Sequence, residues 1–300
     1  MRNPNRWLMT GALALALTAG IQTPSAQSGN DRSFDYFTLD IPGASASTPQ
    51  GINARGDIVG FYVKNNVTHG FLLSEDVLTT IDYPGAILTT ARGINAQGDI
   101  VGSYRVAGEP AVNVHGYLLS RHGEFSRVDF PGHTNTIPQR ITSAGLILGC
   151  RHDNDMMVTM RGIAMNAKDL MGGTEIGAFG SMSNGATPNG RLTVGLFFDM
   201  DLNRGRGFLL HNGSDLVPFD VPGSASTAAW DVNPSGAVVG VYVAANIAHG
   251  FVWSGPQFES IDVPGAQSTR AFGINPQGTI VGTYTDTSNR THGFIADRRS

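Results

Sequence analysis

Four columns of glycine recur six times along the chain, and this internal repetition constrains the fold more than any other feature of the sequence. Aligning the segments IDxPGA, GINxxGxIVGxY and HGF places glycine in every copy of each column, with successive copies about 44 residues apart. The columns are Gly43, Gly85, Gly132, Gly177, Gly223 and Gly265; Gly56, Gly98, Gly145, Gly190, Gly236 and Gly278; Gly60, Gly102, Gly149, Gly195, Gly240 and Gly282; and Gly70, Gly116, Gly162, Gly207, Gly250 and Gly293. Each copy is therefore expected to form the same structural unit.

Within each copy, four short segments are rich in β-branched and aromatic residues and are bounded by Gly, Pro and Asn. In the second copy these segments are Thr90–Asn95, Ile100–Tyr104, His115–Ser120 and Phe125–Asp129. Four antiparallel strands in about 40–45 residues are typical of a propeller blade. We therefore predict an all-β fold, a six-bladed β-propeller of four-stranded repeats. A twisted solenoid of hairpins is the alternative, although solenoids usually carry atypical terminal caps.

The order of the segments also predicts how the ring closes. The chain opens with a segment that corresponds to a fourth strand, Tyr36–Asp40, and ends with a third strand, His292–Ala296. If the first segment completes the last blade, no long sheet edge is left unpaired. We expect the N-terminal strand to close the ring in this way.

Residues 1–28 have the features of an export signal: Arg2 and Arg6, an uncharged apolar run from Trp7 to Gly20, and small residues around Ala26. The apolar run is shorter than the ~20 residues that span a membrane, so we expect cleavage rather than anchoring. Residues 29–300 are then a single propeller domain, secreted or periplasmic, monomeric and with no membrane association.

The charge of the chain argues against one class of function, and its cysteine content argues against disulfide bonds. The net charge is −4 and only 15% of residues are charged, so the chain lacks the basic surface that nucleic-acid binding requires. The single cysteine, Cys150, excludes an internal disulfide, and we expect its thiol to pack as a small buried hydrophobe.

Several polar residues recur with the repeats. Histidine precedes the fourth glycine in four copies, an aspartate follows one strand later, and a hydroxyl residue lies four positions after the first glycine in all six. A hydrolase could use such residues to relay a proton, but no enzyme needs this many copies of one active site. We interpret them as a buried His–Asp–hydroxyl network that ties strands together within each blade. The residues are His69, His115, His249 and His292; Asp82, Asp129, Asp262 and Asp40; and Ser47, Thr89, Thr136, Ser181, Thr227 and Thr269.

The segments FxxIDxPGA, GINxxGxIVGxY and HGFxxS resemble the HAF-repeat family of predicted extracellular bacterial proteins. The His-Ala-Phe triplet reads His69-Gly70-Phe71 in the first copy and His115-Gly116-Tyr117 in the second. The resemblance covers residues 34–297 and is weak over 141–206. It implies bacterial export and a repeat scaffold, and it brings no catalytic residues with it.

Function in repeat proteins tends to reside in loops that differ between copies. The loop before HGF varies most, and it should lie on the same face of the ring as the PGA connections. In the second copy this loop is an insert, Arg105–Val114, that contains Glu109. In the third copy it carries His152, Asp153 and Asp155. We predict that these three residues and Glu109 bind a ligand. His152 with the two aspartates could also hold a transition metal, although neighbours on a strand point to opposite sides.

The same loop of the fourth copy presents Asp199, Asp201 and Asn203. Alternating oxygen side chains are the ligands that calcium prefers, so calcium is the one cofactor we consider. Arg204 stands where an EF-hand loop requires glycine, and the bidentate acid at the twelfth position is missing. Ordinary turn formation by Asp and Asn explains the pattern equally. Otherwise no cofactor is predicted.

With no unique catalytic set, the leading hypothesis is a non-enzymatic scaffold that binds an extracellular ligand, either a carbohydrate or a protein. The alternative is a polysaccharide hydrolase or lyase on one propeller face, a hypothesis that rests on fold-level analogy. Glycoside hydrolysis would require a pair of acids about 5–9.5 Å apart.

Overall fold

The computed structural model describes residues 33–155, 159–255 and 257–299. The export signal predicted for residues 1–28 lies outside this part of the chain. None of the described residues forms a helix that could cross a membrane. The described elements are strands β1 to β24, so the prediction of an all-β fold is confirmed.

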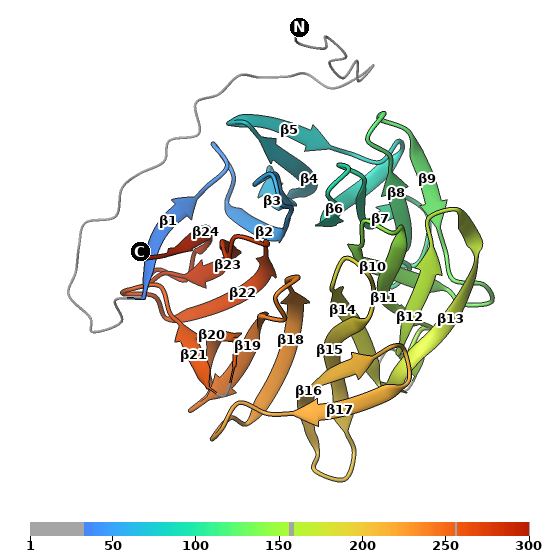
Figure 1. Ribbon diagram of the computed structural model, residues 1–300. Coiled ribbons are helices and arrows are strands. Elements are labelled where there is room, and N and C mark those ends of the chain that lie inside the picture. The colour runs from blue at the N-terminus through green and yellow to red at the C-terminus, as the bar shows by residue number, and fades with distance from the viewer. Residues whose placement is uncertain (1–32, 156–158, 256, 300) are drawn as a thin grey trace, which may run out of the picture.

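The strands form six antiparallel four-stranded sheets arranged as a ring, and the predicted six-bladed propeller is confirmed (Figure 1). Blades 1 to 3 are β2 (Ala46–Ile52), β3 (Ile58–Lys64), β4 (Val67–Ser74) and β5 (Val77–Ile81); β6 (Ala86–Ile94), β7 (Ile100–Val106), β8 (His115–Leu119) and β9 (Phe125–Val128); and β10 (Asn135–Ile141), β11 (Leu146–His152), β12 (Arg161–Asn166) and β13 (Asp169–Phe179). Blades 4 to 6 are β14 (Ser181–Ala186), β15 (Leu192–Asp199), β16 (Arg204–His211) and β17 (Asp215–Phe219); β18 (Ser226–Val232), β19 (Val238–Ala244), β20 (Ile247–Trp253) and β21 (Phe258–Ile261); and β22 (Ser268–Ile274), β23 (Ile280–Thr285), β24 (Thr291–Arg298) and β1 (Phe34–Leu39).

The first strand of each blade contacts the first strands of both neighbouring blades, so these six strands surround the central channel (Figure 1). Connections between blades, with the PGA sequence, lie on one side of the ring, together with the loop between the second and third strands of each blade. We call this the PGA side. The Asn-x-x-Gly turns lie on the opposite side, which we call the Asn-turn side.

The ring closes through the N-terminal strand, as the sequence predicts. Strand β1 pairs with β24 in antiparallel register from Phe34 opposite Arg298 to Leu39 opposite Gly293. Phe34 and Tyr36 of β1 pack with Phe294 and other buried residues of blade 6 in one hydrophobic cluster. The first and last parts of the chain therefore share a sheet and a core.

Steric crowding explains why every copy has glycine in the third column, which runs from Gly60 to Gly282. A Cβ atom on Gly240 would lie 2.1 Å from the carbonyl oxygen of Ala228 on the neighbouring inner strand, and the corresponding glycines of the other blades meet the same obstacle. Only glycine permits the two strands to approach so closely. This approach occurs beside a β-bulge that every blade contains.

The bulge leaves one residue of each inner strand without a partner on the second strand. Such a residue breaks the alternation of the strand and turns its side chain in a new direction. We call these six residues the bulge residues: Gln50, Arg92, Gln139, Asn184, Trp230 and Phe272.

Candidate functional site in the central channel

A cavity of about 370 Å³ opens in the channel among blades 1, 2, 5 and 6. Four of the six bulge residues line it, and the inner-strand residues around it precede or occupy the bulge, which places it toward the PGA side. We call it the channel hollow. Its lining is Thr48, Gln50, Phe61, Arg92, Ala228, Trp230, Val241, Arg270, Phe272 and Thr283.

The hollow is positively charged, although the whole chain carries a net negative charge. Its lining contains two arginines, Arg92 and Arg270, and no carboxylate. Neither guanidinium forms a salt bridge with any described residue. Arg270 is exposed and its Nη1 atom donates a hydrogen bond to Ser268.

Arg92 lies deeper than Arg270. Its Nη1 atom lies 3.4 Å from the Oε1 atom of Gln139, while its Nε atom is shielded from solvent and has no hydrogen-bond partner among the described residues. Burial lowers the pKa of Arg92, because the charged guanidinium has lost water without gaining a carboxylate. The Arg92 side chain is half-buried, and a partly desolvated charge is costly unless a partner of opposite charge satisfies it.

Two aromatic bulge residues form the opposite wall. The rings of Trp230 and Phe272 meet edge to face, with centroids 5.0 Å apart and planes at 78°. Such a corner offers apolar surface across the hollow from the charge of Arg92. Ligand pockets in proteins commonly combine apolar walls with a few placed polar groups.

An ion pair lies one residue beyond the bulge and closes the channel beneath the hollow. Arg140 and Asp231 pair at 3.0 Å, and both side chains are less than a tenth exposed. Arg140 also donates to the carbonyl oxygen of Phe272, while Asp231 accepts from the backbone N–H groups of Val232 and Ile274. Burial raises the pKa of Asp231, and the charge of Arg140 opposes that effect. Beyond the pair, the Asn-turn side holds a smaller cavity of about 90 Å³.

The remaining blades make room for this ion pair. At the position after the bulge, four copies have glycine: Gly51, Gly93, Gly185 and Gly273. A Cβ on Gly51 would lie 2.8 Å from Nη1 of Arg140, and one on Gly185 would lie 2.8 Å from Oδ1 of Asp231. The two copies without glycine supply the two charges that pair across the channel.

Sequence reasoning missed the channel hollow and the ion pair beneath it. One signal was available: in the column that reads glycine in four copies, the two exceptions carry opposite charges, Arg140 and Asp231. The bulge residues gave no such signal, because their types differ in every copy but two.

The predicted ligand residue Glu109 lies at the outer part of blade 2. Its Oε2 atom lies 2.7 Å from Nε2 of His115, whose Nδ1 atom faces Asp129 at 3.3 Å. The hydrogen bond with His115 is the main reason why the pKa of Glu109 falls below its usual range. Glu109 thus holds the blade 2 insert against the recurring His–Asp pair, and it does not line the channel hollow.

The predicted ligand residues of blade 3 engage local partners. The buried His152 ring donates from Nδ1 to the carbonyl oxygen of Asp153. The Asp153 carboxylate accepts from the backbone N–H of Thr134 and pairs with His133 at 3.0 Å, and these contacts lower its pKa. The Asp155 carbonyl accepts a hydrogen bond from the backbone N–H of Thr159. None of the three lines the channel hollow.

The residues nominated for calcium lie in the β15–β16 hairpin. Oδ1 of Asp199 accepts from the backbone N–H groups of Asp201 and Leu202, and Oδ2 pairs with Arg206 at 3.2 Å. The hydrogen bond from Leu202 is the largest of the effects that lower the pKa of Asp199. Asn203 has φ of 49°, the left-handed geometry of a turn. Turn formation accounts for these contacts, and calcium binding stays a prediction. Over residues 33–155, 159–255 and 257–299, no three His, Cys, Asp or Glu side chains gather as a metal group.

The recurring His–Asp pairs form in each predicted blade, but two parts of the predicted network are wrong. The hydroxyls do not join the pairs; Ser47, for example, accepts from the backbone N–H of Ile41 and so fixes the connection between blades. The pairs are also not uniformly buried, since the Asp82 side chain is 50% exposed. The pairs are His69–Asp82, His115–Asp129, His249–Asp262 and His292–Asp40.

The blades that lack the recurring histidine keep a charge pair. Arg206 in blade 4 pairs with Asp220, the recurring aspartate of that copy, and Arg161 in blade 3 lies 4.0 Å from Glu175. The charge pair therefore persists where the residue type changes. Cys150 is buried as expected, and burial raises the pKa of its thiol to about 12.

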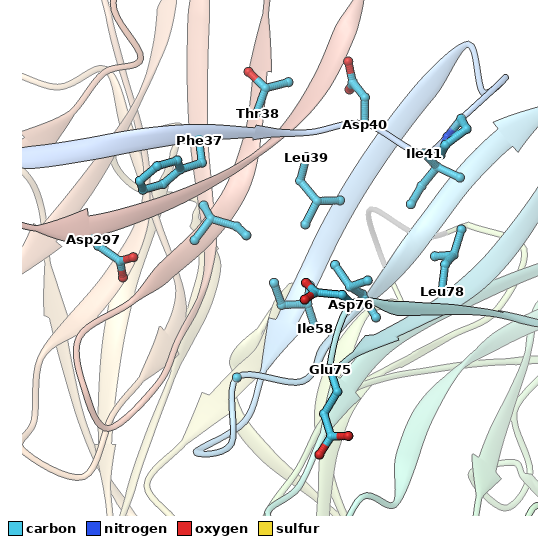
Figure 2. Close-up of a pocket in the computed structure, with 14 residues that line it drawn as sticks. Phe37, Thr38, Leu39, Asp40, Ile41, Ile58, Glu75, Asp76, Leu78 and Asp297 are labelled. Carbon is cyan, nitrogen blue, oxygen red and sulfur yellow. The ribbon is translucent and has the colours of Figure 1, made fainter. Parts of the chain in front are cut away.

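A second cavity, of about 380 Å³, lies between β1 and blade 1 at the seam of the ring. Leu39, Ile58 and Leu78 face a common space there, whereas the carboxylates of Asp40 and Glu75 point away from it (Figure 2). Asp76 and Asp297 also line this groove, so its charged groups are all acidic. The channel hollow, which combines two arginines with hydroxyl, amide and aromatic groups, is the stronger candidate site.

No known protein family and no curated sequence matches this chain. Solved structures do. A gluconolactonase from Xanthomonas campestris is 14% identical with a TM-score of 0.55, covering 96% of this chain and 97% of its own. A putative TolB from Agrobacterium tumefaciens is 12% identical with a TM-score of 0.60, covering 88% and 93%. The propeller domain of the Trilobed protease from Pyrococcus furiosus is 8% identical with a TM-score of 0.51, covering 86% and 96%. At these identities, the likeness shows a shared β-propeller fold and nothing further.

Proposed function

We propose that this protein is an exported, non-enzymatic propeller that binds a small extracellular ligand in the channel hollow. The observation that carries the proposal is Arg92, a guanidinium that lines a cavity of about 370 Å³ and forms no salt bridge with any described residue. A cationic group that has lost part of its water without gaining a partner of opposite charge favours a ligand as that partner.

The composition of the lining supports binding rather than hydrolysis. The hollow contains hydroxyl, amide, guanidinium and aromatic groups, but no Asp, Glu, His or Cys that could act as a general acid or base. The alternative, a polysaccharide hydrolase or lyase, needs paired acids, and two acids of the variable loops, Glu109 and Asp153, are engaged by His115 and His133.

The export signal in residues 1–28 supports a secreted or periplasmic location, and so does the resemblance to the HAF-repeat family. In that setting the ligand is a carbohydrate, a related small molecule, or a segment of another protein. The volume of about 370 Å³ is at the small end of the range of ligand pockets, which favours a small ligand.

A thermal-unfolding screen tests the proposal on residues 29–300, which contain the whole described ring. The panel holds neutral sugars, sugar acids, amino acids, aromatic acids and nucleotides. A ligand at 100 times its Kd stabilises by about 2.7 kcal/mol, which in a domain of this size raises the Tm by several degrees, at roughly 2–4 °C per kcal/mol. Trp230→Ala should abolish the shift, because Trp230 lines the hollow.

Trp253→Phe is the matched control, since Trp253 packs against Phe219 and Phe258 and does not line the hollow. It should respond as the wild type does, and the ligand should be recovered unchanged by NMR. Turnover of a panel compound that is abolished by Glu109→Gln or Asp153→Asn would contradict the proposal in favour of the enzyme.

A further inference from the structure

The charges around the channel hollow indicate the chemical class of its ligand. Arg140 is a buried arginine of the channel, and its charge is matched by Asp231. Arg92 has no such match, and Arg270 adds a second unpaired cation at the exposed part of the lining. The hollow therefore has one deep positive charge and one peripheral one, with no competing acid in its lining.

Resting on the proposed function, we propose that the ligand is an organic carboxylate whose acid group pairs with Arg92 and whose six-membered ring packs against Trp230 and Phe272. A planar guanidinium matches a carboxylate with two parallel hydrogen bonds. Gln139, which already contacts Arg92, keeps the guanidinium from rotating freely. Arg92 pairs with one negative charge, while the exposed Arg270 is screened by water, so the hollow favours a carboxylate over a phosphate dianion.

The aromatic corner explains why the acid should carry a ring. Trp230, which is partly exposed, and Phe272, which packs against it edge to face, supply apolar ring surface to the wall of the hollow opposite Arg92. Both the C–H face of a sugar and the face of an aromatic ring pack on such a surface. A sugar acid and an aromatic acid therefore share the required chemistry.

The ion pair beneath the hollow sets the direction of entry. Because Arg140 and Asp231 fill the channel at the residue after the bulge, the hollow is reached from the PGA side. The acid group of the ligand then enters first, toward Arg92, and the rest of the ligand stays near Arg270. Substituents on the far side of the ring should have little effect on affinity.

Tryptophan emission can report binding directly. In residues 29–300 the tryptophans are Trp230 and Trp253, so Trp253→Phe leaves Trp230, in the hollow, as the reporter. In this background we would titrate galacturonate against galactose and benzoate against benzyl alcohol. We expect at least one acid to bind about tenfold or more tighter than its neutral counterpart, as a hydrogen bond to a charged group implies.

Arg92→Gln should remove that preference while leaving the neutral compounds unaffected. Arg290→Gln is the matched control, because Arg290 lies in the β23–β24 turn and loses the same charge outside the hollow. The Tm of each variant shows whether it is folded. Arg92→Lys keeps the positive charge but cannot make two parallel hydrogen bonds to a carboxylate, so it should retain part of the preference for the acid.

The outcomes separate the ligand class from the proposed function. Tighter binding of galacturonate than of galactose identifies the ligand as a sugar acid. Tighter binding of benzoate than of benzyl alcohol identifies it as an aromatic acid. Either result supports the inference. Galactose or benzyl alcohol binding as tightly as its acid, with Arg92→Gln unchanged, would overturn the carboxylate and leave the binding function in place. Failure of all four probes, together with failure of the wider panel to shift the Tm, would overturn both.

Discussion

The Nδ1 atom of His292 lies 2.7 Å from the Oδ2 atom of Asp40, and this contact joins residues 252 positions apart. His292 belongs to β24 and Asp40 follows β1, so the pair lies at the seam where the ring closes. The Nε2 atom of the same ring faces Asp286 at 3.1 Å. One imidazole thus has carboxylates on both of its nitrogen atoms.

This arrangement predicts a pH dependence of stability. Burial disfavours the protonated imidazole of His292 and lowers its pKa. The hydrogen bonds with Asp40 and Asp286 favour the protonated form more strongly, so the pKa of His292 is raised above 6.5. A raised folded-state pKa stabilises the fold below the unfolded pKa, and that stabilisation is lost as pH rises through the folded value. The free energy of unfolding should be higher at pH 6 than at pH 8, by at most about 1 kcal/mol for partly exposed partners.

Urea unfolding of the wild type and His292→Gln at both pH values measures the effect. Carboxylates with lowered pKa, such as Asp57, lose their stabilising charge only when the pH falls to about their usual 3.8 or below, so they do not contribute in this window. An equal pH 6 to pH 8 difference in wild type and variant would show that His292 is not the source.

The third glycine column predicts a steric cost with a matched control. Gly240→Ala places a Cβ 2.1 Å from a backbone oxygen, which should destabilise by more than about 3 kcal/mol or prevent folding. Gly236→Ala meets no atom within 4 Å and is strained only by its φ of +85°, which should cost roughly 1–2 kcal/mol. Urea unfolding of both variants checks the order, and a smaller loss for Gly240→Ala would contradict the close approach of β18 and β19.

The ion pair beneath the hollow should be far more sensitive to losing one partner than to losing both. Arg140→Met leaves the Asp231 carboxylate buried without its cation, at a cost of about 3–5 kcal/mol. Adding Asp231→Asn removes the unpaired charge, and the amide oxygen can still accept from Val232 and Ile274. Unfolding of the two single variants and the double variant forms a double-mutant cycle. Additive losses would mean that the two groups do not interact.

Substitutions in the β15–β16 hairpin can distinguish turn formation from calcium binding. Asp199→Asn removes the charge that pairs with Arg206 but keeps an oxygen for the backbone N–H groups of Asp201 and Leu202. If Asp199 acts as a turn former, the variant should lose little Tm and Asp199→Ala clearly more. Calcium binding would instead appear as a Tm that rises with calcium, falls with chelator, and no longer responds in an Asp199→Ala, Asp201→Ala variant.

The architecture could be predicted from the sequence because the same pattern of strand-forming segments and glycine positions occurs in all six repeats. Agreement of glycine at Gly60 and its equivalents indicates a steric requirement even before its cause is known. The candidate site was beyond this reasoning, because a bulge shifts a strand by one residue and leaves no mark in its composition. Arg92 and Trp230 are far apart in the sequence, and only the curvature of the ring brings both to one cavity.

The error in the recurring network has a similar cause. Ser47 and His69 were grouped because both recur, but recurrence does not specify which groups meet. The bend at the blade connection brings the backbone N–H of Ile41 to the Ser47 hydroxyl, and this satisfies a donor in the connection. Local backbone geometry therefore determined a contact that side-chain chemistry alone had assigned elsewhere.

Closure by β1 gives the folding of this chain an order in time. β1, the first strand of the ring in the sequence, pairs with β24, so until β24 has been synthesised β1 has no partner and blade 6 consists of β22 and β23 alone. Contacts over such a separation in sequence form slowly. A chain interrupted before β24 thus leaves β1 and the outer edge of β23 unpaired and leaves Phe34 and Tyr36 without their packing partner Phe294, all of which favour aggregation and proteolysis. The ring therefore closes only in a chain that contains both β1 and β24.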